Sequence, residues 1–241
     1  MLKKIRLVLL PNVLNPDQES IASCFTAATL ELVPTLDGLI VENEKEGRKY
    51  LKRFSFPEGR TFRDVPMREL SEHTSDEQMK DIIAEMKPGQ VWGLISDAGM
   101  PCFADPGAKI VYLARRAGIE VEAHVGPSSI LFAVMLSGLY AQKFTFEGYL
   151  PKEELQQIAY IKQMQLRSSK EGSTHVFIET PYRNQSLFDQ LLSILEDRTQ
   201  LSILCDMSLP TQEVATYTVK EWKKMNKADL KKRLVVFVIR A

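Results

Sequence analysis

The stretch QVWGLISDAGMPCFADPG, residues Gln90–Gly107, decides the fold of this chain. Its apolar run Val91–Ile95 is too short for an ordinary helix and predicts a buried strand. The strand must end in the turn that follows, because Gly99 permits unusual backbone angles and the next proline lacks an N–H. A helix is predicted from about Pro106 to Ala117, with Asp105 as its N-cap. Strand, glycine turn and helix in this order are typical of an open α/β sheet that presents backbone N–H groups to a ligand at its carboxyl edge.

Strands and helices alternate over the first part of the chain. Strands are predicted at 3–10, 38–41, 91–95 and 119–124, and helices at 17–32, 44–53, 75–86, 106–117 and 130–136. Residues 54–74 are largely polar and contain two prolines, so we interpret them as a long loop anchored by its phenylalanines. A capping box, Ser75–Gln78, opens the helix that follows this loop. The alternation predicts a mainly parallel sheet with helices on both faces.

The pattern changes near residues 139–143. Beyond them, strands are predicted at 145–149, 174–179, 201–206, 214–219 and 233–239, and helices at 153–168, 184–195 and 220–225. Runs of strands with few helices between them indicate a mixed sheet. We therefore expect an N-terminal α/β domain over residues 1–141 and a C-terminal α+β domain over residues 142–241.

Composition limits the classes of function. The 241 residues include 31 Lys and Arg against 31 Asp and Glu, a formal net charge of zero. This balance argues against nucleic-acid binding driven by net charge, but leaves a local basic patch open. The three cysteines and three histidines are dispersed, so we expect neither a disulfide framework nor a metal site. We recognise no signal peptide or membrane span and expect a cytoplasmic protein.

A series of motifs resembles the tetrapyrrole methylase family, the class III S-adenosylmethionine-dependent methyltransferases. In chain order they are SDAGMP at 96–101, DPG at 105–107, GP at 126–127, Gly138 and GYLP at 148–151, with a weaker match, FIETPYR, at 177–183. Within the family the chain most resembles the ribosomal RNA small-subunit methyltransferase I branch, which methylates a cytidine 2′-hydroxyl. We expect it to lack the C-terminal extension of that branch's longer members, because Ala241 closely follows the last strand.

The resemblance implies a two-domain enzyme that holds S-adenosylmethionine between its domains, usually as a homodimer. It implies cofactor contacts at Pro11, Asp97, Gly99, Met100, Phe103, Ser128, Ser129, Glu179 and Ser208. Ser128 and Ser129 lie at a predicted helix start, where turn N–H groups attract an anion such as the methionine carboxylate. N-capping alone would also explain these serines, as an Asx turn would explain Asp97 and core packing would explain Phe103.

Three side chains are candidates for the chemistry: Glu42, Glu179 and Arg183. Methyl transfer from a sulfonium is a direct displacement, and a ribose hydroxyl benefits from a general base or a nearby cation. Glu42 is a candidate base, although capping or an ion pair at a helix start would also explain it. Arg183 is a candidate phosphate contact, because its planar guanidinium suits anions.

The chain departs from the usual motifs of this branch at residues 12–15, 43–45 and 206–211, where it reads NVLN, NEK and DMSLPT. Three functions remain open: methylation of ribosomal RNA, methylation of a tetrapyrrole or another small acceptor, and binding of cofactor or RNA without catalysis. The DAG loop favours the first over the second, and the departures favour the third. Neutral charge counts against RNA, because phosphate contacts normally carry much of the affinity.

Overall fold

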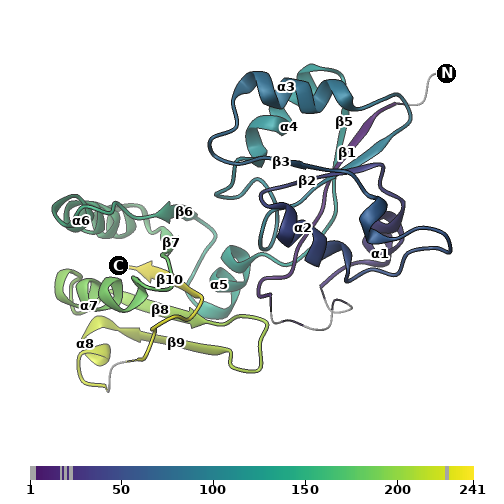
Figure 1. The fold of residues 1–241 in the computed structure, drawn as a ribbon. Helices are drawn as coiled ribbons and strands as arrows, with labels where there is room; N and C mark the ends of the chain where they lie inside the picture. Colours follow the sequence, from purple (N-terminus) through teal and green to yellow (C-terminus); the bar gives the residue numbers. More distant parts are fainter. Residues whose placement is uncertain (1–3, 17, 19–20, 22–23, 226–227) are drawn as a thin grey trace. The chain divides into compact units, whose positions relative to one another are not determined.

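Two compact units make up the computed structural model, which describes residues 4–16, 18, 21, 24–225 and 228–241 (Figure 1). Their contacts divide the chain between Ser128 and Ser129. The domain boundary predicted from the sequence lies later, between residues 141 and 142. The division falls earlier because helix α5 (Ser129–Ser137) packs on the sheet of the second unit.

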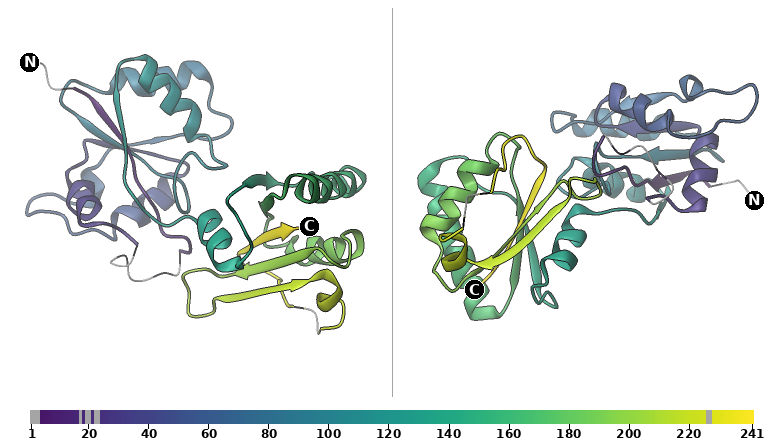
Figure 2. Two further views of the ribbon diagram at one scale, coloured as in Figure 1. Left: turned by 180° about the vertical axis from the view of Figure 1, so that it is seen from behind. Right: turned by 90° about the horizontal axis from the view of Figure 1, so that it is seen from below.

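The first unit is built on a five-stranded parallel sheet with the order β3-β2-β4-β1-β5 (Figures 1 and 2). Its strands are β1 (Arg6–Leu9), β2 (Gly38–Val41), β3 (Met67–Glu69), β4 (Val91–Leu94) and β5 (Glu120–Ala123). All five carboxyl ends therefore meet at one edge. The parallel sheet expected from the alternation of elements is confirmed.

Helices cover both faces of this sheet. Helices α1 (Ala27–Leu32) and α2 (Glu44–Leu51) pack on one face, and α3 (Asp76–Glu85) and α4 (Gly107–Arg116) pack on the other. Alternate strand residues supply the two cores, because successive side chains of a strand point to opposite faces. Val8 and Leu39 belong to the first core, and Leu7, Ile40 and Trp92 belong to the second.

Part of the predicted helix over residues 17–32 is wrong: among its described residues, 18, 21 and 24–26 are not helical. Its last part is helical, as α1, which begins after Thr26; the Thr26 side chain accepts the Thr29 N–H at 3.3 Å. Residues 17, 19–20 and 22–23 lie outside the described residues. Thr26 explains the late start, since a capping threonine fixes where a helix begins.

The long loop predicted over residues 54–74 is also wrong, because it contains β3 and a 3₁₀ turn, η2 (Phe62–Asp64). Strand β3 has three residues and pairs only with β2 among the described strands, at the edge of the sheet. So short a strand is defined by its partner rather than by its own pattern. The anchoring role of Phe54 is confirmed: it is buried and stacks on Phe25, with ring centroids 5.6 Å apart.

The second unit has a mixed five-stranded sheet with the order β6-β7-β10-β8-β9. Its strands are β6 (Phe144–Tyr149), β7 (Thr174–Ile178), β8 (Gln200–Cys205), β9 (Glu213–Thr218) and β10 (Val235–Arg240). Strands β6 and β7 are parallel, and the other pairings are antiparallel. The mixed sheet predicted from the run of strands is confirmed.

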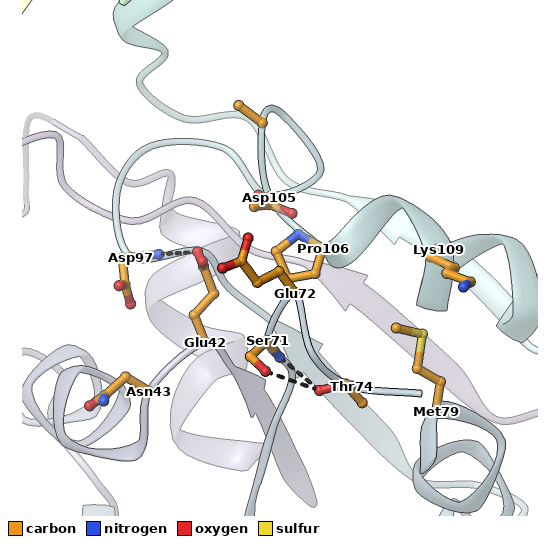
Figure 3. A pocket seen from close by; sticks show the side chains of 11 residues that line it. Glu42, Asn43, Ser71, Glu72, Thr74, Met79, Asp97, Asp105, Pro106 and Lys109 are labelled. Atoms are coloured by element: carbon orange, nitrogen blue, oxygen red, sulfur yellow. Dashed lines mark hydrogen bonds between the residues drawn. The ribbon is translucent and has the colours of Figure 1, made fainter. Parts of the chain in front are cut away.

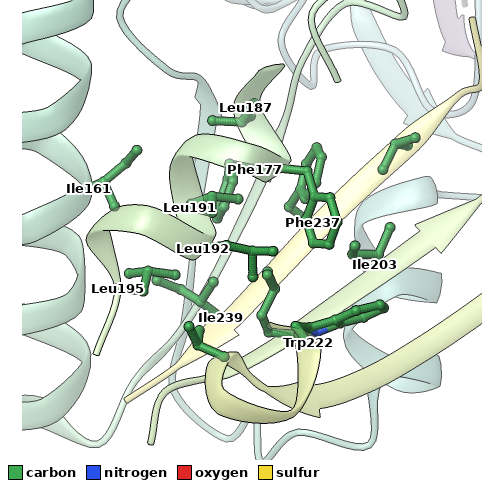
Figure 4. Close-up of a cluster of buried hydrophobic side chains, with 14 of the residues drawn as sticks. Ile161, Phe177, Leu187, Leu191, Leu192, Leu195, Ile203, Trp222, Phe237 and Ile239 are labelled. Atoms are coloured by element: carbon green, nitrogen blue, oxygen red, sulfur yellow. Dashed lines mark hydrogen bonds between the residues drawn. The ribbon is translucent and has the colours of Figure 1, made fainter. Parts of the chain in front are cut away.

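One face of the second sheet carries helices α6 (Glu154–Glu171), α7 (Asn184–Ile194) and α8 (Val219–Trp222), and the other carries α5 (Figure 1). Figure 4 shows the core under the three helices. Phe177 and Phe237 stack there with centroids 5.5 Å apart. Trp222 donates its indole N–H to the Leu201 carbonyl at 2.8 Å, so its polar atom is satisfied.

A bulge in β6 turns one acid into the interior of this unit. The register with β7 shifts between Phe146 and Gly148, so Glu147 has no residue opposite it, and Gly148 takes a φ of +66°. The Glu147 side chain is 4% exposed; its Oε1 lies 2.6 Å from His175 Nδ1 and 2.9 Å from an Arg167 guanidinium nitrogen.

The partners of Glu147 decide its ionisation. Burial alone would raise its pKa, but hydrogen bonds from Tyr160, His175 and Arg167 outweigh burial and hold the pKa below the ordinary value. The other ring nitrogen of His175, Nε2, lies 3.0 Å from Ser173 Oγ. Each buried polar group of this cluster therefore has a partner, which is the condition under which buried charge is tolerated.

Candidate active site

The carboxyl edge of the first sheet has its switch point between β4 and β1. After β1 the chain leads to α1 on one face, and after β4 it leads to α4 on the opposite face. Loops that diverge in this way open a crevice, where open α/β sheets bind ligands. The two loops concerned, Leu10–Asn15 and Ser96–Gly107, carry most of the site residues predicted in the first unit.

Asn12 fastens these two loops together. Its side-chain amide donates to the carbonyl oxygens of Ser96 and Asp97, both at 3.0 Å, and its backbone N–H donates to Gly99 at 2.8 Å. The side chain is buried, and its own Oδ1 accepts the Val13 N–H at 2.8 Å. The sequence analysis noted Asn12 only as a departure from a motif. An asparagine directly after a buried strand end was the signal for its role.

The loop after β4 is held in an uncommon backbone conformation. Gly99 has a φ of +69°, and two residues with side chains, Cys102 and Ala104, have φ values of +73° and +61°. Such conformations persist only where the surrounding structure enforces them, and they cluster at ligand sites. Enforcement comes from Asp105, whose carboxylate accepts the N–H groups of Cys102 and Gly107, both at 2.7 Å.

Asp105 does not act as the predicted N-cap at the start of a helix from Pro106. Helix α4 begins at Gly107, and its N-cap position is Pro106, which offers no side-chain hydrogen bond. The Asp105 carboxylate instead bridges the loop and the first helical residue. It therefore shapes the loop as well as starting the helix.

A cavity of about 740 Å³ opens beside this loop in the first unit (Figure 3). Its acids come from three strand ends: Glu42 after β2, Glu72 after β3, and Asp97 and Asp105 after β4. Among the described residues that line it, Lys109 is the only cation, and it pairs with Asp76 outside the cavity lining. Ser71 and Thr74, joined by a 2.9 Å hydrogen bond from the Ser71 N–H, form part of its wall.

Burial raises the pKa of each of three acids in this cavity. For Glu42 the Asp97 N–H partly offsets burial, while the charges of Asp97 and Asp105 add to it. For Asp97 the charge of Glu46 adds to burial, and for Asp105 three backbone N–H groups oppose it without cancelling it. Raised carboxylate pKa values in a cavity are typical of sites that bind or transfer protons.

Glu42 is placed by the fold rather than used as a helix cap. The N-cap of α2 is Asn43, whose Oδ1 accepts the Lys45 N–H at 2.9 Å. Glu42 Oε1 accepts the Asp97 N–H at 2.9 Å, across the carboxyl ends of the neighbouring strands β2 and β4. The structure thus brings two predicted site residues together in the cavity.

Other predicted cofactor residues of the first unit lie along the same edge. Pro11 and Gly126 approach so closely that a Cβ on Gly126 would lie 2.0 Å from the Cβ of Pro11 and 3.4 Å from the sulfur of Met100. Phe103 is 61% exposed, so core packing does not explain it. Ser128 is buried and immediately precedes α5, whose first residue is Ser129.

The predicted residues of the second unit gather at one edge of its sheet. Strands β7 and β8 both run antiparallel to β10, so Glu179 after β7 and Ser208 after β8 follow carboxyl ends at the same edge. Ser208 has a φ of +76°, and its N–H donates to Gln212 Oε1 at 3.1 Å.

Glu179 and Arg183 are neighbours within this unit. Glu179 is 7% exposed, and its Oε1 accepts the Thr180 N–H at 2.7 Å. Its Oε2 lies 3.4 Å from an Arg183 guanidinium nitrogen and has no hydrogen-bond partner within the described part of the chain. Arg183, at the N-cap position of α7, is therefore engaged with an internal carboxylate.

The donor set fits S-adenosylmethionine. This cofactor carries an ammonium and a sulfonium, and both cations are attracted by anionic side chains. Its ribose hydroxyls and adenine amino group can donate hydrogen bonds to carboxylate oxygens. Glu42 and Asp97 supply such acceptors, and the exposed Phe103 supplies an aromatic face for a base. Three or more acidic, histidine or cysteine side chains arranged for a metal ion do not occur among the described residues.

Comparison with known proteins relates the chain to a family. The family model for Tetrapyrrole (Corrin/Porphyrin) Methylases matches residues 25–223. A protein of Thermotoga maritima named Ribosomal RNA small subunit methyltransferase I is 31% identical, over 81% of this chain and 82% of its own length. A protein of the same name from Halalkalibacterium halodurans is 28% identical, and the match spans 64% of that protein.

Solved structures extend the likeness to the fold. The crystal structure of the methyltransferase CobJ superposes with a TM-score of 0.60 at 13% identity, covering 98% of this chain and 93% of that one. At such low identity the likeness concerns the fold alone. None of the described helices has the length and apolar character needed to cross a lipid bilayer.

Proposed function

This chain belongs to the tetrapyrrole methylase family of S-adenosylmethionine-dependent methyltransferases, and from that premise we propose that it methylates a cytidine 2′-hydroxyl of small-subunit ribosomal RNA. The names of its relatives supply the acceptor, since those from Thermotoga maritima and Halalkalibacterium halodurans are both called Ribosomal RNA small subunit methyltransferase I. We place this activity in the cytoplasm, where that RNA is found.

The observation that carries the methyltransferase site is the constrained loop Ser96–Gly107 beside the acidic cavity. We propose that Pro11, Asp97, Gly99, Met100, Phe103 and Ser128 of the first unit, and Ser129, Glu179 and Ser208 of the second, hold the cofactor. When bound, S-adenosylmethionine supplies an electrophilic methyl group on sulfur. The protein's part is to position the acceptor oxygen in line with that methyl group.

Glu42 is our candidate for the general base. Its Oε1 is fixed by the Asp97 N–H, which leaves Oε2 to take the proton of the attacking hydroxyl. Its raised pKa makes it a stronger base than an ordinary glutamate. Glu179 and Arg183 are paired with each other, and we assign them to positioning.

A second acceptor class is favoured by the charge of the cavity. Four carboxylates and one lysine line it, and such a lining repels phosphate groups. A small neutral or cationic acceptor would enter this cavity more easily than an RNA backbone. The alternative function is therefore methylation of a small acceptor with the same cofactor.

We also propose a homodimer. Helix α5 is apolar along most of its length, yet its side chains Leu131, Met135 and Leu136 are 51%, 74% and 44% exposed in the single chain. Apolar side chains grouped in this way mark association surfaces. Light scattering of the purified protein tests the proposal, and a monomer mass at micromolar concentration would contradict it.

The decisive experiment is methyl transfer in vitro. Small ribosomal subunits from a strain lacking the gene are incubated with the protein and S-adenosylmethionine labelled on its methyl group, and RNA nucleosides are analysed by mass spectrometry. We expect one new 2′-O-methylcytidine. Binding of the cofactor by calorimetry without any transfer to RNA would reject the RNA acceptor. Absence of both binding and transfer would indicate a chain that has lost the family's chemistry.

A further inference from the structure

The first unit has a second cavity at the opposite end of its sheet from the candidate active site. It measures about 480 Å³ and is lined by Ile5, which precedes β1, and Ile119, which precedes β5. It therefore lies at the amino edge of the parallel sheet. The methyltransferase function, whose candidate residues in this unit lie at the carboxyl edge, does not account for it.

Helices α3 and α4 form its walls with the same spacing of side chains. Each contributes residues at positions i, i+3 and i+4, which lie on one face of a helix. These are Lys80, Ile83 and Ala84 from α3, and Leu113, Arg116 and the C-cap residue Ala117 from α4. The small side chains of the two alanines leave room for the cavity, and the larger apolar side chains line its floor. Each helix also contributes one cation.

Within the described residues neither Lys80 nor Arg116 makes an ion pair or a side-chain hydrogen bond. Two acids near them in the sequence pair with other cations: Glu85 with Arg68 through a guanidinium contact of 2.6 Å, and Glu120 with Lys4 at 3.8 Å. An apolar floor beside two free cations matches a ligand with an apolar body and an anionic head.

We propose that this cavity binds a small free carboxylate with an unbranched apolar chain, such as a medium-chain fatty acid. Its volume falls within the range of about 300–1,000 Å³ that is usual for small-ligand sites. The chain lies between Ile83, Leu113 and Ile119, and the carboxylate lies between Lys80 and Arg116. Arginine favours such an anion because its planar fork matches the two carboxylate oxygens.

The test is titration of the full chain with decanoate, below the concentration at which decanoate forms micelles, followed by calorimetry. We expect saturable binding at one site per chain. The double variant Lys80→Gln/Arg116→Gln should weaken binding at least about tenfold, the usual order for losing charged hydrogen bonds. Arg115→Gln is the matched control, because Arg115 neighbours Arg116 on α4 but does not line the cavity; it should leave binding unchanged.

Two further arms separate the head group from the chain. Decanol has the same chain without charge. We expect the natural protein to bind decanol more weakly than decanoate, and the double variant to bind the two compounds with equal affinity. Ala84→Phe should fill the cavity and abolish binding of both compounds, with the fold checked by circular dichroism. Heat without saturation, equal affinity for decanol and decanoate in the natural protein, or an equal loss in Arg115→Gln would each overturn the proposal.

Discussion

Two glutamates, the buried Glu147 in the second unit and the half-buried Glu42 in the first, show opposite uses of the same side chain. Glu147 in the second unit is surrounded by Tyr160, His175 and Arg167, which hold its pKa below the ordinary value. Glu42 in the first unit has one backbone N–H as partner and acids as neighbours, and burial raises its pKa. The arrangement around Glu147 stabilises the ionised carboxylate and the fold. The arrangement around Glu42 destabilises the ionised carboxylate, so that binding of a cationic ligand or of the acceptor's proton is favoured.

The difference extends from the two side chains to the two units. In the first unit the acids of the cavity are gathered on loops, one of which contains residues with strained backbone. In the second the buried acid sits in a bulged strand and is held by strand and helix side chains. Each unit also contains one of the two tryptophans, Trp92 and Trp222, so unfolding of each can be followed separately.

The largest expected effect concerns activity. Glu42→Gln keeps an acceptor for the Asp97 N–H but removes the base, so methyl transfer should fall by roughly 10²–10⁴-fold, the usual contribution of general-base catalysis. The free energy of unfolding should stay the same or rise, because a carboxylate with a raised pKa disfavours the folded state at neutral pH. Glu72→Gln, another acid of the cavity lining, is the control and should change the rate only slightly. Equal losses in both variants would refute a specific role for Glu42.

The next largest effect concerns stability. Glu147→Gln leaves Arg167 without its counter-charge and His175 Nδ1 without a carboxylate partner, and should lower the free energy of unfolding of the second unit by about 3 kcal/mol. Urea unfolding monitored by Trp222 fluorescence, in a Trp92→Phe background, measures it. Glu171→Gln, which breaks an exposed ion pair with Lys143, serves as the comparison and should shift the midpoint little. Similar shifts for the two variants would mean that the Glu147 cluster is not stabilising.

A smaller effect is expected where the loops of the first unit are fastened. Asn12→Ala removes the donor for the buried Ser96 carbonyl and for the carbonyl of Asp97, and should cost about 1–3 kcal/mol. Trp92 fluorescence in a Trp222→Phe background reports it. If this loop holds the cofactor, calorimetry should also find weaker binding of S-adenosylmethionine to the variant. An unchanged affinity would show that the loop does not contribute to cofactor binding.

The smallest effect is a pH dependence of opposite sign in the two units. The stabilisation from Glu147, with a lowered pKa, is present above the ordinary glutamate value of 4.5 and is lost as pH falls through the lowered pKa. Glu42, Asp97 and Asp105 have raised pKa values, so they protonate at a higher pH than ordinary carboxylates. Their protonation removes the cost of ionised carboxylates in the folded first unit. As pH falls from neutral towards the ordinary carboxylate values, the first unit should therefore gain stability relative to the second. Parallel unfolding midpoints of the single-tryptophan variants over this range would contradict the assignment.

Local signals in the sequence predicted much of the fold. Strand β2 has the predicted bounds, and α3 follows the predicted capping box, in which Ser75 and Gln78 exchange hydrogen bonds. Gly138 ends α5 with a φ of +69°, as expected of a glycine at a helix end. These features depend on a few neighbouring residues, which is why sequence alone is sufficient for them.

Features that depend on distant partners were missed. Strand β3 is defined by pairing with β2, and the tie from Asn12 reaches a loop far along the chain. Ser71 and Glu72 fall in the predicted long polar loop, and no site role was predicted for them, although they line the cavity. The motifs predicted the loop after β4, but no local pattern indicated that Glu42 would meet Asp97 across two strand ends.

The β6 bulge constrains how the gene can change. The residue between Phe146 and Gly148 is Glu147 itself, so its deletion would leave Gly148 opposite Phe177 and Tyr149 opposite Ile178, now in regular pairing with β7. The strand would keep its register, but the interior of the unit would lose the carboxylate that His175 and Arg167 contact. An in-frame deletion of this one codon would therefore spare the pairing of β6 and remove its buried acid.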